Sequence, residues 1–396
     1  MMPALETQPG DPLMDSPERA ELRRMIRQLI EEISPAEHTS VLDESETFDA
    51  QLYSKLAELG LLGIDAPEEF GGGGDVRDQL VLIEELAKGP TSMAAFMISQ
   101  FAVVQVLASF GRTAQAREVL AALVAGRTRV SFALSEPDGG TDVARVMKTR
   151  ARRVDSGGFV LHGQKTWISG AAEADWLVVL ARSSEIERSP VEGITMFLVP
   201  TNLPGIEIRA IDTLGIHSLS TCDVFLDDVE VPEETILGDL DRGMRQVFAT
   251  VNREGLNAAA ATLGVGLGAL ELAIEHTKER FVFGKPVASF QVPQHWMVDA
   301  AVQLEAARSL MGRAAEIEVA GGNADSLASM AKLIASEAAV EISLKGMQLM
   351  GGAGYTRASA MQRLFRDGRL WSFSPLNNEM VRNRLGEGWL GLPRSY

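Results

Sequence analysis

The densest cluster of polar side chains in this chain lies in the segment FALSEPDGGTD, from Phe132 to Asp142. An alternating apolar run leads into Ser135, a Pro-Asp-Gly-Gly turn follows, and Thr141 comes next. This order places hydroxyl groups and exposed backbone N–H groups at the end of a strand, where they can bind a phosphate or the edge of a heteroaromatic ring. A β-turn without a ligand is the alternative interpretation, because Pro, Asp and Gly are the ordinary residues of such turns.

A second candidate segment is GQKTWISG, from Gly163 to Gly170. Trp167 offers a flat face on which an aromatic ring can stack, and Ser169 offers a hydroxyl group. Taken alone, the segment is equally suited to the core of a β-domain.

In sequence order, these two segments resemble those of the acyl-CoA dehydrogenase family. The resemblance includes four further segments, which are PEEFGGGG at 67–74, ERFVFGKPVASFQ at 279–291, MQLMGGAGY at 347–355 and RLFRDGRL at 363–370. It therefore spans nearly the whole chain, and it implies two helical domains around a central β-domain.

The resemblance implies an FAD cofactor that two groups of residues hold. The residues expected at the flavin ring are Phe132, Leu134, Ser135, Thr141, Trp167, Ile168 and Ser169. The residues expected at the pyrophosphate and adenosine end, typically of a neighbouring subunit, are Arg280, Phe283, Gln291, Gln348, Gly351 and Gly352. An arginine is a fixed cation for phosphate oxygens, and glycines let the backbone approach a nucleotide closely. A site shared between chains implies a homotetramer, or at least a dimer.

The family's reaction removes a proton and a hydride from an acyl thioester. A base takes the α-proton while the flavin N5 takes the β-hydride, which gives the 2-enoyl thioester. The resemblance implies an acyl-CoA or an acyl-carrier thioester as substrate and an electron-transfer flavoprotein as electron acceptor. Thr141, Asn252 and Gly255 are the predicted substrate-binding residues.

The family's usual base is missing from its expected place. In most members a Glu follows the Arg-Asp-x-Arg segment, but counting from Gln348 without a gap places that position on Pro375. Leu376 and Asn377 replace the family's next two residues, and Asn377 keeps a side chain that can hydrogen-bond to FAD. Proline also lacks the backbone N–H that in the family polarises the thioester carbonyl, a loss of about 3 kcal/mol of enolate stabilisation unless Ser374 or Asn377 replaces the donor.

Isovaleryl-CoA and long-chain acyl-CoA dehydrogenases resemble this chain in carrying the base on an earlier helix. Counting backward from Arg280 without a gap places that base at Glu254 and keeps Gly264 in register. In this register Asn252 replaces the family's Asp and Gly255 replaces its Arg.

Three alternatives to this assignment stay open. Aligning Arg253 with the family's Arg would require two extra residues in a continuous helix, which would rotate the following face by about 200°. Glu254 can also be an ordinary carboxylate at a helix start. Glu379 is a further candidate base, although a structural pair with Arg382 at i+3 explains it equally.

The elements that must position these residues change from helical to strand-like and back along the chain. Apolar residues recur every three or four positions from Ser16 to about Ala125, alternate between about Val130 and Pro232, and return to helical spacing after Gly238. Because helices and strands do not alternate, a doubly wound parallel sheet is excluded. The predicted fold class is α+β, with an N-terminal helical domain (1–129), a central β-domain of barrel or sandwich type (130–240) and a C-terminal four-helix bundle (241–396).

One stretch, from Leu256 to Ile274, is apolar over nearly the length that a bilayer requires. Its small residues, including Gly264, Gly266 and Gly268, favour a helix packed closely on all sides inside a bundle. We therefore predict no membrane span.

Composition excludes several classes of partner. The net charge is −17 without any Lys/Arg-rich run, so nucleic acids and anionic membranes are poor partners. Cys222 is the only cysteine, which excludes an internal disulfide and favours a reducing compartment. The N-terminus lacks the charged and apolar regions of a signal peptide, so a cytoplasmic location is expected. The five histidines lack metal-ligand spacing, so no metal is predicted.

Three functions agree with these residues. The first is an FAD-dependent acyl-CoA dehydrogenase with Glu254 as base. The second is a flavin oxidase, a monooxygenase or an acyl-carrier-protein thioester dehydrogenase with the same fold. The third is a non-catalytic flavin-binding subunit of a hetero-oligomer, for which no base would be needed.

Overall fold

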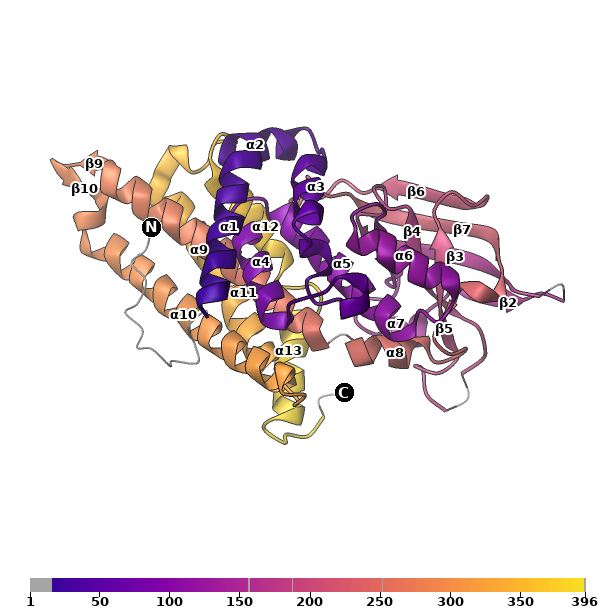
Figure 1. Cartoon of the computed structure of the whole chain (residues 1–396). Helices are drawn as coiled ribbons and strands as arrows, with labels where there is room; N and C mark the ends of the chain where they lie inside the picture. The colour runs from indigo at the N-terminus through magenta and orange to yellow at the C-terminus, as the bar shows by residue number, and fades with distance from the viewer. Residues whose placement is uncertain (1–15, 156, 187, 251, 395–396) are drawn as a thin grey trace.

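Helices precede and follow one large sheet in this chain, so the predicted α+β class is confirmed (Figure 1). The computed structural model describes residues 16–155, 157–186, 188–250 and 252–394. In Figure 1 the sheet lies at one end of the molecule, the long helices of the C-terminal domain lie at the other, and the N-terminal helices lie between them.

The N-terminal domain is helical because its apolar residues recur at helical spacing between polar caps. Its elements are α1 (Pro17–Ile33), α2 (Ala36–Glu44), α3 (Ala50–Glu58), η1 (Leu61–Gly63), η2 (Glu68–Phe70), α4 (Val76–Ala87), α5 (Thr91–Phe110) and α6 (Ala114–Val124). Ser16 caps α1, and Asp75 and Asp78 form a capping box at the start of α4. Helix α5 is apolar on all sides because its first half contacts the helical core and its second half packs against the sheet.

The central domain contains an eight-stranded mixed sheet. Its elements are β1 (Val130–Ala133), α7 (Val143–Val146), β2 (Arg150–Arg153), β3 (Phe159–Ser169), β4 (Trp176–Arg182), β5 (Ile194–Pro200), β6 (Ile206–Ala210), β7 (Thr221–Val231), η3 (Glu233–Thr235) and β8 (Ile236–Leu237). The strand order is β6-β7-β3-β2-β4-β5-β8, and β1 pairs with β4 in parallel. Strands β2 and β8 were not predicted, because RARR carries no apolar alternation and β8 has only two residues.

The C-terminal domain is built on long helices, as the returning helical period predicts. Its elements are α8 (Gly243–Thr250), α9 (Asn252–Glu279), β9 (Phe281–Val282), β10 (Lys285–Pro286), η4 (Val287–Ser289), α10 (Gln291–Val319), α11 (Asp325–Met350), η5 (Gly351–Ala353), α12 (Ala360–Leu370) and α13 (Asn378–Gly388). Helices α9 to α12 pack together as the bundle, and α4 of the N-terminal domain lies against α9.

The glycines of α9 let the backbones of neighbouring helices come close. A Cβ atom added to Gly264 would lie 2.2 Å from the carbonyl oxygen of Glu84, and one added to Gly268 would lie 2.6 Å from that of Lys88. A Cβ at Gly266 would lie 2.5 Å from Leu304 on the α10 side. The close packing expected from these small residues is therefore confirmed.

Within the described part of the chain, two helices are long and apolar enough to cross a membrane, namely Thr91–Phe110 and Arg253–Glu279. In the structure 61% and 83% of their most apolar windows are buried by the rest of the chain. Both helices lie in the core, and their apolar character follows from that packing.

Charged groups are buried beside the contact of α4 with α9. Glu84 accepts hydrogen bonds from Arg23 (2.8 Å) and Arg308 (2.6 Å), while Glu85 binds Arg27 at 2.7 Å. Burial alone would raise the pKa of Glu84, but the surrounding cations lower it to about 2. A paired charge of this kind holds α1, α4 and α10 together, because removing one partner would leave the other buried without compensation.

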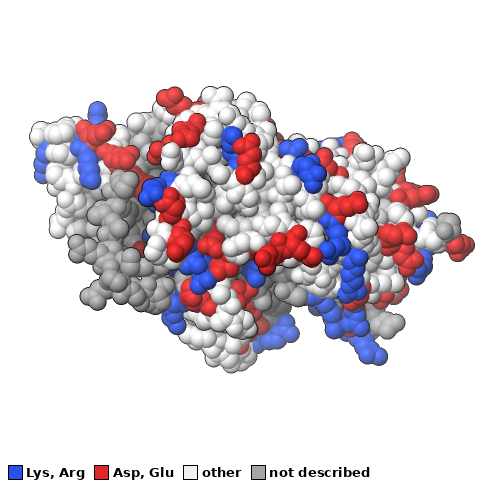
Figure 2. Space-filling model, in the orientation of Figure 1, with Lys and Arg blue, Asp and Glu red and all other residues white. Residues whose placement is uncertain are grey.

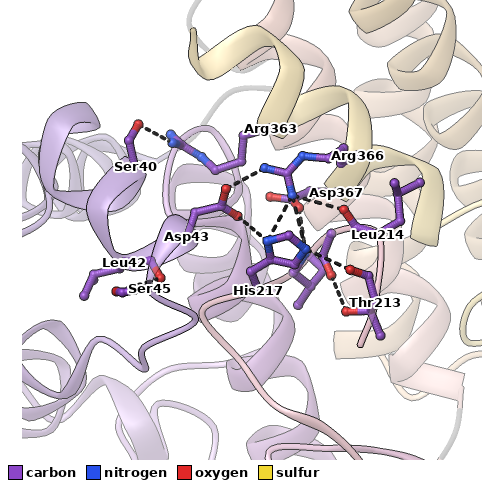
Figure 3. A network of polar contacts seen from close by, with 12 residues as sticks. Ser40, Leu42, Asp43, Ser45, Thr213, Leu214, His217, Arg363, Arg366 and Asp367 are labelled. Atoms are coloured by element: carbon purple, nitrogen blue, oxygen red, sulfur yellow. Dashed lines mark hydrogen bonds and ion pairs between the residues drawn. The ribbon is translucent and has the colours of Figure 1, made fainter. Parts of the chain in front are cut away.

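A polar network joins all three domains (Figure 3). Arg366 of α12 binds Asp43 of α2, and His217, from the loop before β7, lies 3.5 Å from the same carboxylate. Asp367 is buried and accepts the backbone N–H of Ile216 at 2.7 Å, and this burial raises its pKa to about 6. The arrangement of the three domains in space thus rests in part on side chains from residues 43, 217 and 367, which are far apart in the sequence.

We expect Gly264→Ala to destabilise the protein by about 1–3 kcal/mol, because the added methyl group would overlap the carbonyl oxygen of Glu84. Gly255→Ala is the matched control on the same helix, since its added Cβ would lie 4.0 Å from Ala328. Urea unfolding followed by circular dichroism measures both. Equal stabilities of the two variants would contradict the close-packing argument.

Candidate active site

The two segments predicted to hold a flavin ring lie side by side at the edge of the β-domain. The backbone N–H of Thr166 donates to the carbonyl of Ser135 at 3.0 Å. The hydroxyl of Ser131 donates to the carbonyl of Ser169 at 2.9 Å. The structure therefore brings the β1 segment with Phe132, Leu134 and Ser135 beside the β3 segment with Trp167, Ile168 and Ser169, while Thr141 lies in the turn after β1 and contacts Asn377.

A buried ion pair fastens the same two segments. Lys165, with none of its side chain exposed, donates to Glu136 at 2.8 Å and to the carbonyl of Leu134 at 3.2 Å. Glu136 also accepts the backbone N–H groups of Lys148 and Thr149, at 2.6 and 3.0 Å. Burial lowers the pKa of Lys165 to about 8, whereas Lys165 and these hydrogen bonds keep the pKa of Glu136 below its usual value despite burial.

Trp167 is turned out of the sheet by an irregularity in β3. The register between β3 and β7 shifts between Lys165 and Ile168, and Trp167 has a left-handed backbone with φ of 60°. Its side chain is 61% exposed, whereas Ile168 beside it is buried. Bulges with this effect are common beside active sites, where they redirect a side chain.

Asn377 connects the C-terminal domain to the ring group. Its side-chain oxygen accepts the backbone N–H of Met380 at 2.8 Å and so caps α13, while its amide nitrogen donates to Thr141 at 3.3 Å. Asn377 is thus fixed from both sides. Pro375, two residues earlier, is exposed.

Glu254 lies on the first turn of α9, next to α8, which in turn packs against β5 of the sheet. The helix is continuous from Asn252 to Glu279, without an inserted bulge. The Glu254 side chain is half-buried, and no described residue forms a hydrogen bond or an ion pair with its carboxylate. Burial alone raises the pKa of Glu254 to about 7.

The residues next to Glu254 leave its carboxylate without a cation. Arg253 points elsewhere, since its guanidinium binds Asp65 at 2.9 Å and Glu318 at 3.1 Å. Gly255 faces Ala328 of α11, with space for a Cβ atom between them. The side chain of Asn252, predicted to contact substrate, lies outside the described part of the chain.

The second group of predicted cofactor residues lies at the opposite end of the molecule. Arg280, Phe283, Gln291, Gln348, Gly351 and Gly352 are all exposed, around the β9–β10 hairpin and the end of α11. Figure 1 shows this hairpin at one tip and the strands of the ring group at the other. One chain therefore does not bring the two groups together, which agrees with the expectation that a neighbouring subunit supplies one of them.

Both groups suit the parts of FAD expected at them. Trp167 presents an exposed aromatic face near hydroxyl and backbone groups, as stacking and hydrogen bonding of a flavin ring require. Arg280 has no carboxylate partner among the described residues, and a Cβ atom at Gly351 or Gly352 would meet nothing within 4 Å. A free guanidinium beside an open glycine backbone can bind a pyrophosphate.

Sequence reasoning missed three features of this region. The Lys165–Glu136 pair and a buried Lys332 on α11 were not singled out, although a lysine among alanines on an apolar helix is a visible signal. Arg382 binds Glu337 rather than Glu379, so the proposed i+3 pair is wrong, because α11 places a carboxylate closer. The ligand atoms of His162, Asp227 and Asp228, on β3 and β7, lie within 4.8 Å of one another, but all three side chains are exposed.

The surface offers no further site of one charge sign on the face drawn in Figure 2. Acidic and basic side chains are mixed over all three domains in that view.

Comparison with known proteins identifies three consecutive family domains. Residues 16–127, 131–229 and 241–390 match the N-terminal, middle and C-terminal domains of acyl-CoA dehydrogenases. The chain is 31% identical to acyl-CoA dehydrogenase FadE12 of Mycobacterium tuberculosis over 97% of its length and 98% of that protein. It is 32% identical to the mitochondrial short-chain specific acyl-CoA dehydrogenase of Rattus norvegicus, over 93% and 90%.

A similar fold is found among solved structures. Butyryl-CoA dehydrogenase from Megasphaera elsdenii superimposes with a TM-score of 0.89 at 30% identity, covering 95% of this chain and 100% of that one.

We expect Lys165→Met to destabilise the protein by about 3–5 kcal/mol, because Glu136 would stay buried without its cation. The amount of FAD retained by the purified variant should also fall, because the two segments of the ring group would lose the ion pair that joins them. Lys148→Met is the control, because its pair with Asp138 is exposed and should matter little. Thermal unfolding and the flavin content of the purified protein measure the two effects; identical behaviour of both variants would refute the role of the buried pair.

Proposed function

Because this chain belongs to the acyl-CoA dehydrogenase family, we propose that it oxidises an acyl-CoA to the 2-enoyl-CoA with Glu254 as the base. Members of this family are FAD-containing oxidoreductases that act on CH–CH bonds. The observation that carries the assignment of the base is the unpaired carboxylate of Glu254, whose pKa is raised by burial to about 7. A subunit without catalytic function would not need such a group.

The chemistry of Glu254 follows from its surroundings. A carboxylate that titrates near neutral pH is ionised often enough to accept a proton and basic enough to remove one from a carbon next to a thioester carbonyl. With no cation beside it, its basicity is not lowered, and the neutral form after proton transfer suits the half-buried position. When bound, FAD supplies the acceptor for the β-hydride.

The proposal gives separate residues the tasks of orienting the flavin and of approaching the substrate. The ring group and Asn377 would orient the flavin, and Glu254 would approach the substrate from the end of α9. Since Pro375 has no N–H, either the thioester carbonyl lies differently from its place in the family or another donor, such as Ser374 or Asn377, would help to polarise it.

We propose that the protein is a homotetramer, or at least a dimer, with FAD sites shared between chains. The support is the separation of the ring group from the Arg280 group in one chain (Figure 1). Exposed aromatic residues at the hairpin end add to it, since Phe283 is 95% and Tyr355 is 85% exposed. Large exposed apolar groups of this kind mark contact surfaces. An electron-transfer flavoprotein is the proposed electron acceptor.

Glu254→Gln should abolish bleaching of the flavin by acyl-CoA, lowering its rate by about 10²–10⁴-fold, because the amide cannot accept the α-proton. In the unmodified protein the rate should rise with pH through about 7, as Glu254 loses its proton. Anaerobic stopped-flow absorbance with a panel of acyl-CoAs measures both. Glu275→Gln, on the exposed far part of α9, is the matched control and should leave the rate unchanged.

Two results would overturn this function. If no acyl-CoA bleaches the flavin of the unmodified protein, the dehydrogenase proposal fails. If bleaching survives in Glu254→Gln, another residue is the base, and Glu379 becomes the next to test. Rapid reoxidation of the reduced flavin by air would indicate an oxidase.

Subunit sharing predicts complementation between two inactive variants. Arg280→Glu should prevent FAD binding at one half of each site, and Glu254→Gln should remove the base from the other half. Co-expressed variants should recover about a quarter of the activity, because random pairing leaves that share of sites with both native residues. No recovery in purified mixed oligomers would mean that each site is built by a single chain.

A further inference from the structure

Lys332 lies in the interior of the C-terminal domain, although no carboxylate of the described residues contacts it. Its side chain is only 2% exposed, and its ammonium donates to the carbonyl oxygen of Leu376 at 2.7 Å and to the side-chain oxygen of Asn378 at 2.8 Å. Ser336, one turn further along α11, exchanges hydrogen bonds with the same Asn378. Both contacts of Lys332 therefore go to one short segment, residues 376–378.

An unpaired charge in this position costs free energy, so its retention requires an explanation. Burial lowers the pKa of Lys332 to about 8, and the carboxylates within range, Glu379 of α13 and Glu337 of α11, only partly oppose this. An apolar side chain would fill the same space without that cost. We therefore look for the function of Lys332 in the segment that its ammonium group binds.

The segment that Lys332 holds is the one that faces the ring group. Asn377 lies between the two residues that Lys332 binds, and it is the residue that donates to Thr141 in the β-domain. The segment is also the part of the chain that lost the family's usual base. The other fixed points of this segment are the N–H of Asn378, which donates to the carbonyl of Ser372, the carbonyl of Asn377, which accepts from the N–H of Val381, and the side-chain cap that Asn377 provides to α13.

We propose that Lys332 is a positioning residue for FAD: by holding the backbone of Leu376 and the side chain of Asn378, it fixes Asn377 against Thr141 and so shapes the flavin end of the site. This proposal rests on the proposed function, because it assumes that the ring group binds FAD. The position on α11 agrees with it. Ala328, one turn before Lys332 on α11, faces Gly255, the residue that follows Glu254 on α9.

The first test compares FAD affinity in Lys332→Met and Lys345→Met. Methionine matches the length of lysine but cannot donate, so we expect FAD to bind about tenfold more weakly in Lys332→Met. Lys345 is on the same helix and pairs with Glu341 in contact with solvent, so its variant should bind FAD as the unmodified protein does. Flavin fluorescence during reconstitution of the deflavinated protein gives the dissociation constants, and the visible flavin spectrum reports changes around the ring.

A double-mutant cycle with Asn377→Ala shows whether Lys332 acts through Asn377. If it does, the double variant Lys332→Met/Asn377→Ala should bind FAD little worse than the weaker single variant; independent effects would multiply. A pH series adds a second signature. FAD affinity of the unmodified protein should fall as pH rises through about 8, where Lys332 loses its charge, and Lys332→Arg should remove this dependence because arginine stays protonated.

The possible outcomes separate this proposal from the function on which it rests. If the unmodified protein does not bind FAD, the proposed function itself fails. If FAD binds but Lys332→Met has the affinity and spectrum of Lys345→Met, Lys332 is only structural and this inference is wrong. Should Lys332→Met not fold, Asn378→Ala, which removes one of its acceptors, and Lys332→Arg decide the matter by the same measurements.

Discussion

The contact between α4 and α9, in which backbone meets backbone, is the constraint on which the rest of this structure depends. Gly264 and Gly268 leave no room for side chains against the carbonyls of Glu84 and Lys88. This contact fixes the position of α9 along its axis and its rotation about that axis. That rotation sends Arg253 to Asp65 and Glu318 and leaves Glu254 at the end of α9 that lies next to α8. The position of the predicted base is therefore a consequence of helix packing far from it.

The buried charged groups of this protein differ in whether they have partners, and those with partners join separate segments of the chain. Glu84 and the Lys165–Glu136 pair are compensated by cations or by several hydrogen bonds, and each joins segments that are distant in the sequence. Lys332 is compensated by a carbonyl and an amide of one segment. Glu254 alone among these groups has no partner, and its raised pKa is the physical result. A site for proton transfer requires a titratable group without a compensating partner. The buried charges that hold the site in place require such partners.

The length of the bundle separates the two halves of the cofactor site. Helices α9 and α11 run in the same direction, with Gly255 facing Ala328 and Gly266 facing Ala339, so both carry their C-terminal ends to the hairpin and their N-terminal ends to the sheet. Residues that recognise a pyrophosphate thus lie one bundle length from those that suit a flavin ring. This separation of the two groups in one chain supports the proposal that a neighbouring chain completes each FAD site.

The sequence by itself determined the fold class, the order of the domains and the residue types available for cofactor binding, because periodicity and local motifs depend on near neighbours in the chain. It also predicted, through ungapped counts, that Pro375 occupies the position of the family's usual base and that Glu254 replaces that base. Only the tertiary structure decided which charges are paired. Lys332, Glu136 and Asp367 are polar residues like many others until folding removes water from them and sets a partner at hydrogen-bonding distance. Burial and pairing depend on contacts between segments that are distant in the sequence. A local sequence pattern does not contain those contacts.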